Sequence, residues 1–134
     1  MSFGNYLENE LLDHVFGMAG SNYTSPATIY CGIGTSTCGE AGTAWGEPWG
    51  IGTYARVAIT PNGFGAATAG TVLNATTVQF VEAGAAWGSM THFGLYDAAT
   101  IGNFLGGGTL TTMRYIDSGD TARFAVSDMT VTLE

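Results

Sequence analysis

Histidine, serine and aspartate side chains can together form a hydrolytic centre when their spacing allows it. His92 lies in the run M-T-H-F-G-L-Y-D, which is typical of a strand, and His14 follows the three acids Glu8, Glu10 and Asp13 on a predicted helix. An activated serine needs a base within hydrogen-bond reach and is often placed on a G-x-S-x-G turn, a pattern that this sequence lacks. We therefore expect no catalytic residues and no enzyme activity.

Aspartates and glycines are the next candidates, for calcium and for phosphate. Asp117, Asp120 and Asp128 carry the hard oxygen ligands that calcium prefers, but they lack the spacing of a calcium loop. Aspartates in turns more often accept hydrogen bonds from nearby backbone amides. The run 106–108 is three glycines without the Lys-Ser/Thr of a phosphate loop, which favours a bulge or tight turn. We expect neither a metal nor a cofactor.

The two cysteines leave two alternatives open. Cys31 and Cys38 are separated by six residues, and the two histidines are far away in the chain, so the spacing is not that of a zinc site. The chain starts with acids rather than with the positive segment of a secretory signal, which favours a reducing environment. We prefer two thiols packed in or beside a strand; a disulfide is the alternative.

The charge balance argues against two classes of partner. The 134 residues include 11 acids, three arginines and no lysine, for a net charge of −8. Arg56, Arg114 and Arg123 are too few and too far apart to neutralise a phosphate backbone, so we expect no nucleic-acid binding. No stretch is long and apolar enough to span a membrane, and we expect no membrane partner.

The low charge content also bears on assembly. Charged residues make up only 10% of the chain, whereas three Trp, six Tyr, seven Phe and five Met supply large apolar side chains. Interface cores are depleted in charge and enriched in such residues. We therefore expect an obligate homo-oligomer, with a trimer preferred. A monomer with a surface of small polar residues is the alternative.

Residues 5–16 predict the one helix of the chain. Its apolar stripe repeats at helical spacing, with acids on the other side; the stripe consists of Leu7, Leu11, Leu12, Val15 and Phe16. Asn5 and Glu8 fit a capping box, and Gly17 fits a C-terminal glycine stop. A twelve-residue helix is marginal alone, so the stripe must pack on its own sheet or on a neighbouring subunit.

The rest of the chain alternates with the period of β-strands. Candidate strands cover 27–34, 54–59, 76–81, 90–97, 102–110, 112–116, 121–126 and 129–133. Seven or eight short strands without intervening helices predict a mainly β protein, an antiparallel, jelly-roll-like sandwich or barrel with one N-terminal amphipathic helix. We expect one domain over 1–134, with a helix and arm at 1–17 and the sandwich at 27–134.

Residues 35–53 form a long loop with two tryptophans. Exposing Trp45 and Trp49 to water is unfavourable, so we expect them either to anchor on another subunit or to fold back as a lid over the sandwich. The anchor is the preferred interpretation.

Several short runs together resemble a known family. They are T-I-Y-C-G-I-G-T at 28–35, Y-A-R-V at 54–57, V-Q-F at 78–80, W-G-S-M-T-H-F-G-L-Y-D at 87–97, G-N-F-L at 102–105, and a closing G-D with M-T-V-T-L. In order and spacing this set is similar to small virion proteins of tailed bacteriophages, which are usually labelled tail-fibre-like or minor structural proteins. The resemblance covers residues 5–134 and implies a non-enzymatic structural role on a phage particle.

The resemblance leaves two positions on the particle open. We expect first a capsid decoration (cement) protein that binds the major capsid protein on the exterior of the head and stabilises the shell. The alternative is a tail-fibre or tail-tip accessory subunit that attaches to host glycans, with Trp45, Trp49 or Trp87 stacking on sugar rings. In both cases the protein is assembled in the host cytoplasm. The candidate interface residues are Leu7, Leu11, Leu12, Val15, Phe16, Trp45, Trp49 and Arg56, although Arg56 has a simpler alternative, an ion pair within its own sheet.

Overall fold

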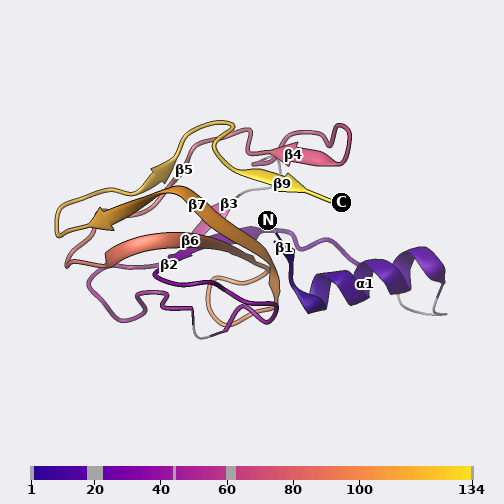
Figure 1. The fold of residues 1–134 in the computed structure, drawn as a ribbon, viewed down its shortest axis with the longest axis horizontal. Coiled ribbons are helices and arrows are strands. Elements are labelled where there is room, and N and C mark those ends of the chain that lie inside the picture. Colours follow the sequence, from indigo (N-terminus) through magenta and orange to yellow (C-terminus); the bar gives the residue numbers. More distant parts are fainter. Residues whose placement is uncertain (1, 18–22, 44, 60–62, 134) are drawn as a thin grey trace.

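One helix and nine strands make up the part of the chain that the computed structural model describes, residues 2–17, 23–43, 45–59 and 63–133 (Figure 1). A two-residue strand precedes the helix and eight strands follow it. In chain order the elements are β1 (Ser2–Phe3), α1 (Asn5–Phe16), β2 (Ile29–Gly34), β3 (Val57–Ile59), β4 (Thr71–Leu73), β5 (Val78–Gln79), β6 (Gly88–Tyr96), β7 (Phe104–Ile116), β8 (Arg123–Phe124) and β9 (Thr130–Thr132). Met1 and Glu134 of the expected domain, and Ala44 of the expected loop, lie outside these residues.

The strands form an open antiparallel sandwich. The large sheet has the order β1-β7-β6-β2-β3, and the pairs β4-β9 and β5-β8 form two small sheets. In Figure 1 the small sheets lie over one side of the large sheet. The expected mainly β, antiparallel architecture is confirmed. Because β1 and β3 end the large sheet, it does not close into a barrel.

Several strand bounds differ from the expected ones. The two strands expected at 102–110 and 112–116 are one strand, β7, since residue 111 continues the extended backbone. β1 and β4 were not expected, because runs of two or three residues carry no periodic signal. The three glycines 106–108 lie inside β7 rather than in a turn, and the register with β6 skips one residue beside them, at Leu105.

The helix has the expected bounds but a different N-terminus. Gly4 is the N-cap and no side chain caps the helix, so the predicted capping box of Asn5 and Glu8 is wrong. The backbone holds the helix instead: Gly4 N–H donates to the carbonyl of Leu105, and Asn5 N–H to that of Glu40, at 3.1 and 3.0 Å. At the other end Gly17 has the left-handed φ of 78°, as expected of a glycine stop.

The main core lies between the large sheet and the small sheets. Alternate residues of the central strands enter it from one side, among them Ile33, Met90 and Leu95, and Phe80 and Met129 enter it from the other. In β2 this face follows the predicted alternation, whereas in β6 a register shift between Met90 and His92 interrupts it, so that Met90, Phe93 and Leu95 all enter the core.

The opposite face of the large sheet carries a row of glycines. Gly32 of β2 pairs with Gly94 of β6, and Gly94 pairs with Gly107 of β7, so three adjacent strands present no side chain at this level. Gly34 extends the bare area along β2. The loop 35–53 fills it: the Trp45 ring and the Glu47 carboxylate lie where β-carbons of these glycines would stand.

This cover changes the environment of β2. The sequence predicts a half-buried strand with Gly32 and Gly34 on the solvent side, yet residues 31–34 are buried on both faces. The glycines at the predicted solvent-facing positions of this strand therefore form a contact surface for another segment of the chain.

A methyl group at Gly34 tests this account. A β-carbon there would lie 2.6 Å from the Trp45 ring and 2.7 Å from the Trp45 carbonyl, so Gly34→Ala should displace the loop and lower the free energy of unfolding by about 1–3 kcal/mol. Urea denaturation measures the change. Gly65→Ala is the matched control, because its β-carbon would meet nothing nearer than 3.7 Å. Equal stability of the two variants would show that the loop does not press on the strand.

Candidate interaction site

Arg56 lies at the centre of a buried polar cluster on the covered face of the sheet. Its Nε and Nη2 groups each donate to one carboxylate oxygen of Glu47, both at 2.8 Å. The two side chains are only 5% and 4% exposed. Nη1 donates to the carbonyls of Ala98 and Ile101, at 3.3 and 2.9 Å. The guanidinium thus ties loop 35–53 to the turn that follows β6.

Aromatic rings complete the cluster. The guanidinium carbon of Arg56 lies 3.4 Å from the centroid of the Tyr96 ring and 5.3 Å from that of Trp49. The Tyr54 hydroxyl donates to Glu47 at 2.7 Å and accepts from Ile33 N–H at 3.1 Å. Burial, reinforced by the Glu47 carboxylate, raises the pKa of Tyr54, so the hydroxyl keeps the proton that it donates.

This arrangement holds a shape rather than performing chemistry. A bidentate arginine–carboxylate pair enclosed by rings and carbonyls has both partners satisfied within one chain. Arg56 therefore has an acidic partner in its own loop, which agrees with the simpler of the two alternatives considered for it. The candidate contact of Arg56 with another subunit stays a prediction.

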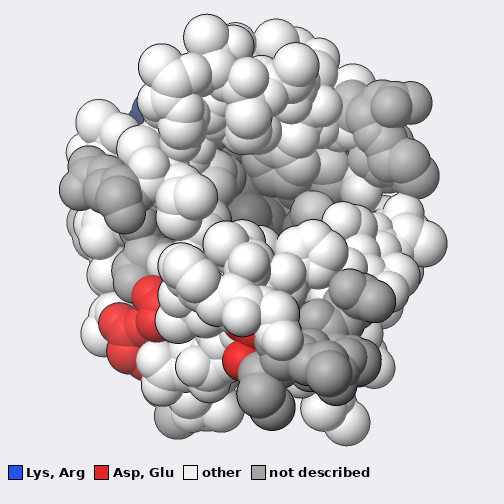
Figure 2. Space-filling view, turned by 90° about the vertical axis from the view of Figure 1, so that its right-hand side faces the viewer, with Lys and Arg blue, Asp and Glu red and all other residues white. Residues whose placement is uncertain are grey.

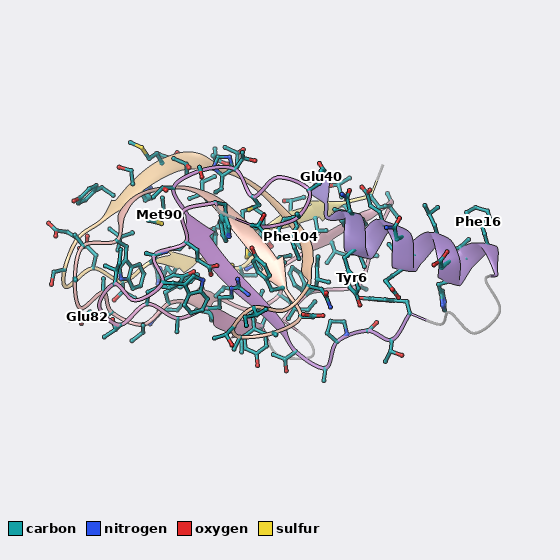
Figure 3. All side chains as sticks on the ribbon, turned by 90° about the horizontal axis from the view of Figure 1, so that it is seen from below. Tyr6, Phe16, Glu40, Glu82, Met90 and Phe104 are labelled. Atoms are coloured by element: carbon teal, nitrogen blue, oxygen red, sulfur yellow. The ribbon has the colours of Figure 1, made fainter. Side chains whose placement is uncertain are left out.

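The helix reaches away from the sheets. Leu7 packs against the main core and Leu11 is half-buried, whereas Leu12, Val15 and Phe16 are 55%, 68% and 80% exposed. Figure 3 shows Phe16 at the far end of α1, beyond the body of the molecule. The predicted stripe is thus divided: its first residues pack on the body of the same chain, and its last residues are mostly exposed.

A groove between β7 and β8 was not anticipated from the sequence. It has a volume of about 540 Å³ and lies between residues 109–116 and 120–124. Its apolar surface includes Met90, Phe93, Leu110 and Phe124. Leu110 alone in a threonine-rich run gives no period-two signal, and the groove exists because β7 and the chain after the turn at 117–120 separate. No local pattern predicts that separation.

Comparison with known proteins now identifies the family. A family model described as podophage GP4 fiber I protein gp80 matches residues 2–132. The chain belongs to this family. No curated protein matches it.

The family settles part of the expected function. The chain is a phage virion structural protein, as its resemblance implied, and its family is one of structural fiber proteins, which agrees with a non-enzymatic role. The family is described as a fiber protein, which supports the tail-fibre alternative better than the head decoration that we expected first. In the residues described, no helix is long and apolar enough to cross a membrane.

The tryptophans of this virion protein differ in exposure. Trp45 is only 2% exposed, stacks on Tyr96 with ring centroids 6.3 Å apart and belongs to a second cluster with Cys38 and Phe104, so it folds back over its own sheet. Anchoring of this loop on another subunit stays a prediction. Trp87 is buried in the main core. Trp49 is 41% exposed and keeps a surface that another molecule can reach.

The remaining candidates for chemistry have structural partners. Asp120 accepts from Asp117 N–H at 2.9 Å, and Asp128 from Ala125 N–H at 2.8 Å, as expected of turn aspartates. Nδ1 of His92 lies 2.7 Å from the Thr91 hydroxyl.

Both cysteines are buried free thiols, which confirms the preferred alternative over the disulfide. Cys31 lies in the main core, and the Cys38 thiol donates to the Phe93 carbonyl at 3.5 Å. Burial raises the pKa of Cys38 to about 12, so this thiol stays protonated at neutral pH.

Neutralising Glu47 tests whether the buried pair holds the loop. Glu47→Gln keeps the size of the side chain but leaves the Arg56 cation buried without a counter-charge, so the free energy of unfolding should fall by about 3 kcal/mol. Chemical denaturation measures it. Glu82→Gln, the same change at an exposed residue, is the control and should cost less than about 0.5 kcal/mol. A loss no larger than that of the control would contradict the role of the pair.

Proposed function

We propose that this protein is a tail-fibre or tail-tip accessory subunit that contributes to attachment at the host surface. The observation that carries the proposal is the match of residues 2–132 to a family described as a podophage fiber protein. Decoration of the head, with the major capsid protein as partner, is the competing assignment.

The fold supports an accessory subunit that functions in an assembly. Among the described residues the only helix has 12 residues, so this part of the chain supplies no long shaft. On the side from which α1 projects, Figure 2 shows two small acidic patches on a surface that is otherwise mostly uncharged. A fibre built from such subunits gains length and valency by association, and we retain the homotrimer as the proposed state.

Trp49 is the residue best placed for a glycan contact. Of the three tryptophans considered, Trp45 and Trp87 are buried, whereas Trp49 stands beside Arg56 with part of its ring exposed. An aromatic ring with one open face offers the flat apolar surface on which a sugar ring can stack.

Labelling on intact particles tests the location. Gold-labelled antibody against this protein should bind at the tail, and its copy number should be small compared with that of the major capsid protein. Electron microscopy and quantitative gel analysis measure the two quantities. Label spread over the head at hundreds of copies would overturn the proposal and support a cement protein.

Removing the exposed ring tests the attachment part separately. Trp49→Ala particles should adsorb to host cells about tenfold more slowly if the ring is a binding hot spot, whereas Trp49→Phe particles should keep most of the rate. Adsorption kinetics measure the effect on particles that carry equal amounts of the protein. Equal rates for Trp49→Ala and wild type would reject the glycan contact and leave the tail location standing.

A further inference from the structure

The exposed face of α1 has the pattern of a helix that docks in a groove. Glu8, Leu12, Val15 and Phe16 lie four, three and one residues apart, so they share one face of the helix, and Glu8 is not opposite the apolar stripe as expected from the sequence. The three apolar members are 55–80% exposed, and Glu8 extends the face toward the sheets. Apolar anchors at i, i+3 and i+4 with an acid one turn earlier are typical of amphipathic helices bound by another molecule.

The β7–β8 groove has the matching properties. Its lining mixes apolar side chains with threonines, arginines and aspartates, and a volume of about 540 Å³ falls in the range of roughly 300–1,000 Å³ that accommodates several side chains. Residues 109–116 on its β7 side extend for roughly 26 Å, against roughly 18 Å for a helix of twelve residues. The strand on this side of the groove is therefore longer than α1, and the groove has room for the side chains of one helix face.

The distribution of charge favours the same pairing. Of the three cations in the chain, Arg56 pairs with Glu47, and this is the only ion pair between described residues. The other two, Arg114 and Arg123, both line the groove, where they lack a carboxylate partner. Asp120 and Asp128 also line it, so the groove carries both signs of charge, and its two arginines are the groups that can attract an acid of the helix. On the face with Leu12, Val15 and Phe16 the helix supplies Glu8.

The helix of one chain is far from the groove of the same chain. Figure 3 places Phe16, at the tip of α1, and Met90, on the groove floor, at opposite ends of the molecule. We propose that α1 of one copy docks in the β7–β8 groove of the next copy, with Leu12, Val15 and Phe16 on the apolar part of its surface and Glu8 near Arg114 and Arg123. The contact joins two different surfaces, so it is heterologous. It deepens the proposed function by naming the partner of the assembly as a second copy.

Two complementary variants of the full chain test the contact. Leu12→Ser with Phe16→Ser removes two of the exposed apolar side chains of the helix. Arg114→Glu with Arg123→Glu reverses the charge of the two basic positions in the groove. All four residues are exposed, so both variants should keep the thermal midpoint of the wild type. Sedimentation should show an oligomer for the wild type and the single-chain mass of 13.9 kDa for each variant alone.

Mixing the two variants gives the decisive result. The mixture holds one intact helix and one intact groove per pair, so it should form a dimer of twice the chain mass and grow no further. As an independent check that misfolding cannot imitate, Glu8→Arg added to the groove variant should restore part of its self-association.

Three results would overturn the proposal. They are a monomeric wild type, an oligomer that survives either double substitution, and a mixture that stays at the single-chain mass. Val81→Ser with Leu133→Ser removes two other exposed apolar side chains and, as the matched control, should leave the oligomer intact. These measurements use purified protein and test only the contact between copies. A negative result would therefore reject this contact without rejecting the tail location, which the labelling experiment tests.

Discussion

The bare glycine row on one face of the large sheet is the constraint on which the rest of the structure depends. Gly32, Gly94 and Gly107 stand side by side on the three central strands, and they allow loop 35–53 to lie directly against the backbone. The loop brings Glu47, whose carboxylate fixes Arg56, and it brings Trp45, which closes the second aromatic cluster. A sheet covered on both faces by so short a chain is possible because one of the covers contains no secondary structure.

The same constraint determines where charge is left for partners. With three cations in the chain, enclosing Arg56 leaves two, and both lie at the groove. Of the acids in the described residues, Glu47 is the one that forms an ion pair. A protein with this balance keeps copies apart by like-charge repulsion unless an apolar contact overcomes it. The exposed end of α1 and the apolar part of the groove can make such a contact.

The sequence predicted what is local and periodic. The helix from Asn5 to Phe16, its stop at Gly17 and the inward face of β2 follow from spacing alone. The cover over Gly32 and Gly34 could not be predicted, because residues far along the chain fill the space that these glycines leave. For the same reason Trp45 and Trp49 have similar local sequences and different exposures: one lies over the glycines and the other beside the Arg56 guanidinium.

A head-to-tail contact limits the forms that the assembly can take. Contacts between two different surfaces repeat from copy to copy, closing into a ring when the rotation per step divides a full turn and otherwise extending as a filament. In a ring of three every helix occupies a groove, so no apolar helix end remains free and no further copy can be added through this contact. In a filament one end keeps a free helix and the other a free groove, so the two ends differ chemically. A fibre that attaches to a particle at one end and to a cell at the other requires two chemically different ends. In a trimeric ring, this difference has to come from surfaces outside the contact between copies. The partly exposed Trp49 is one such surface.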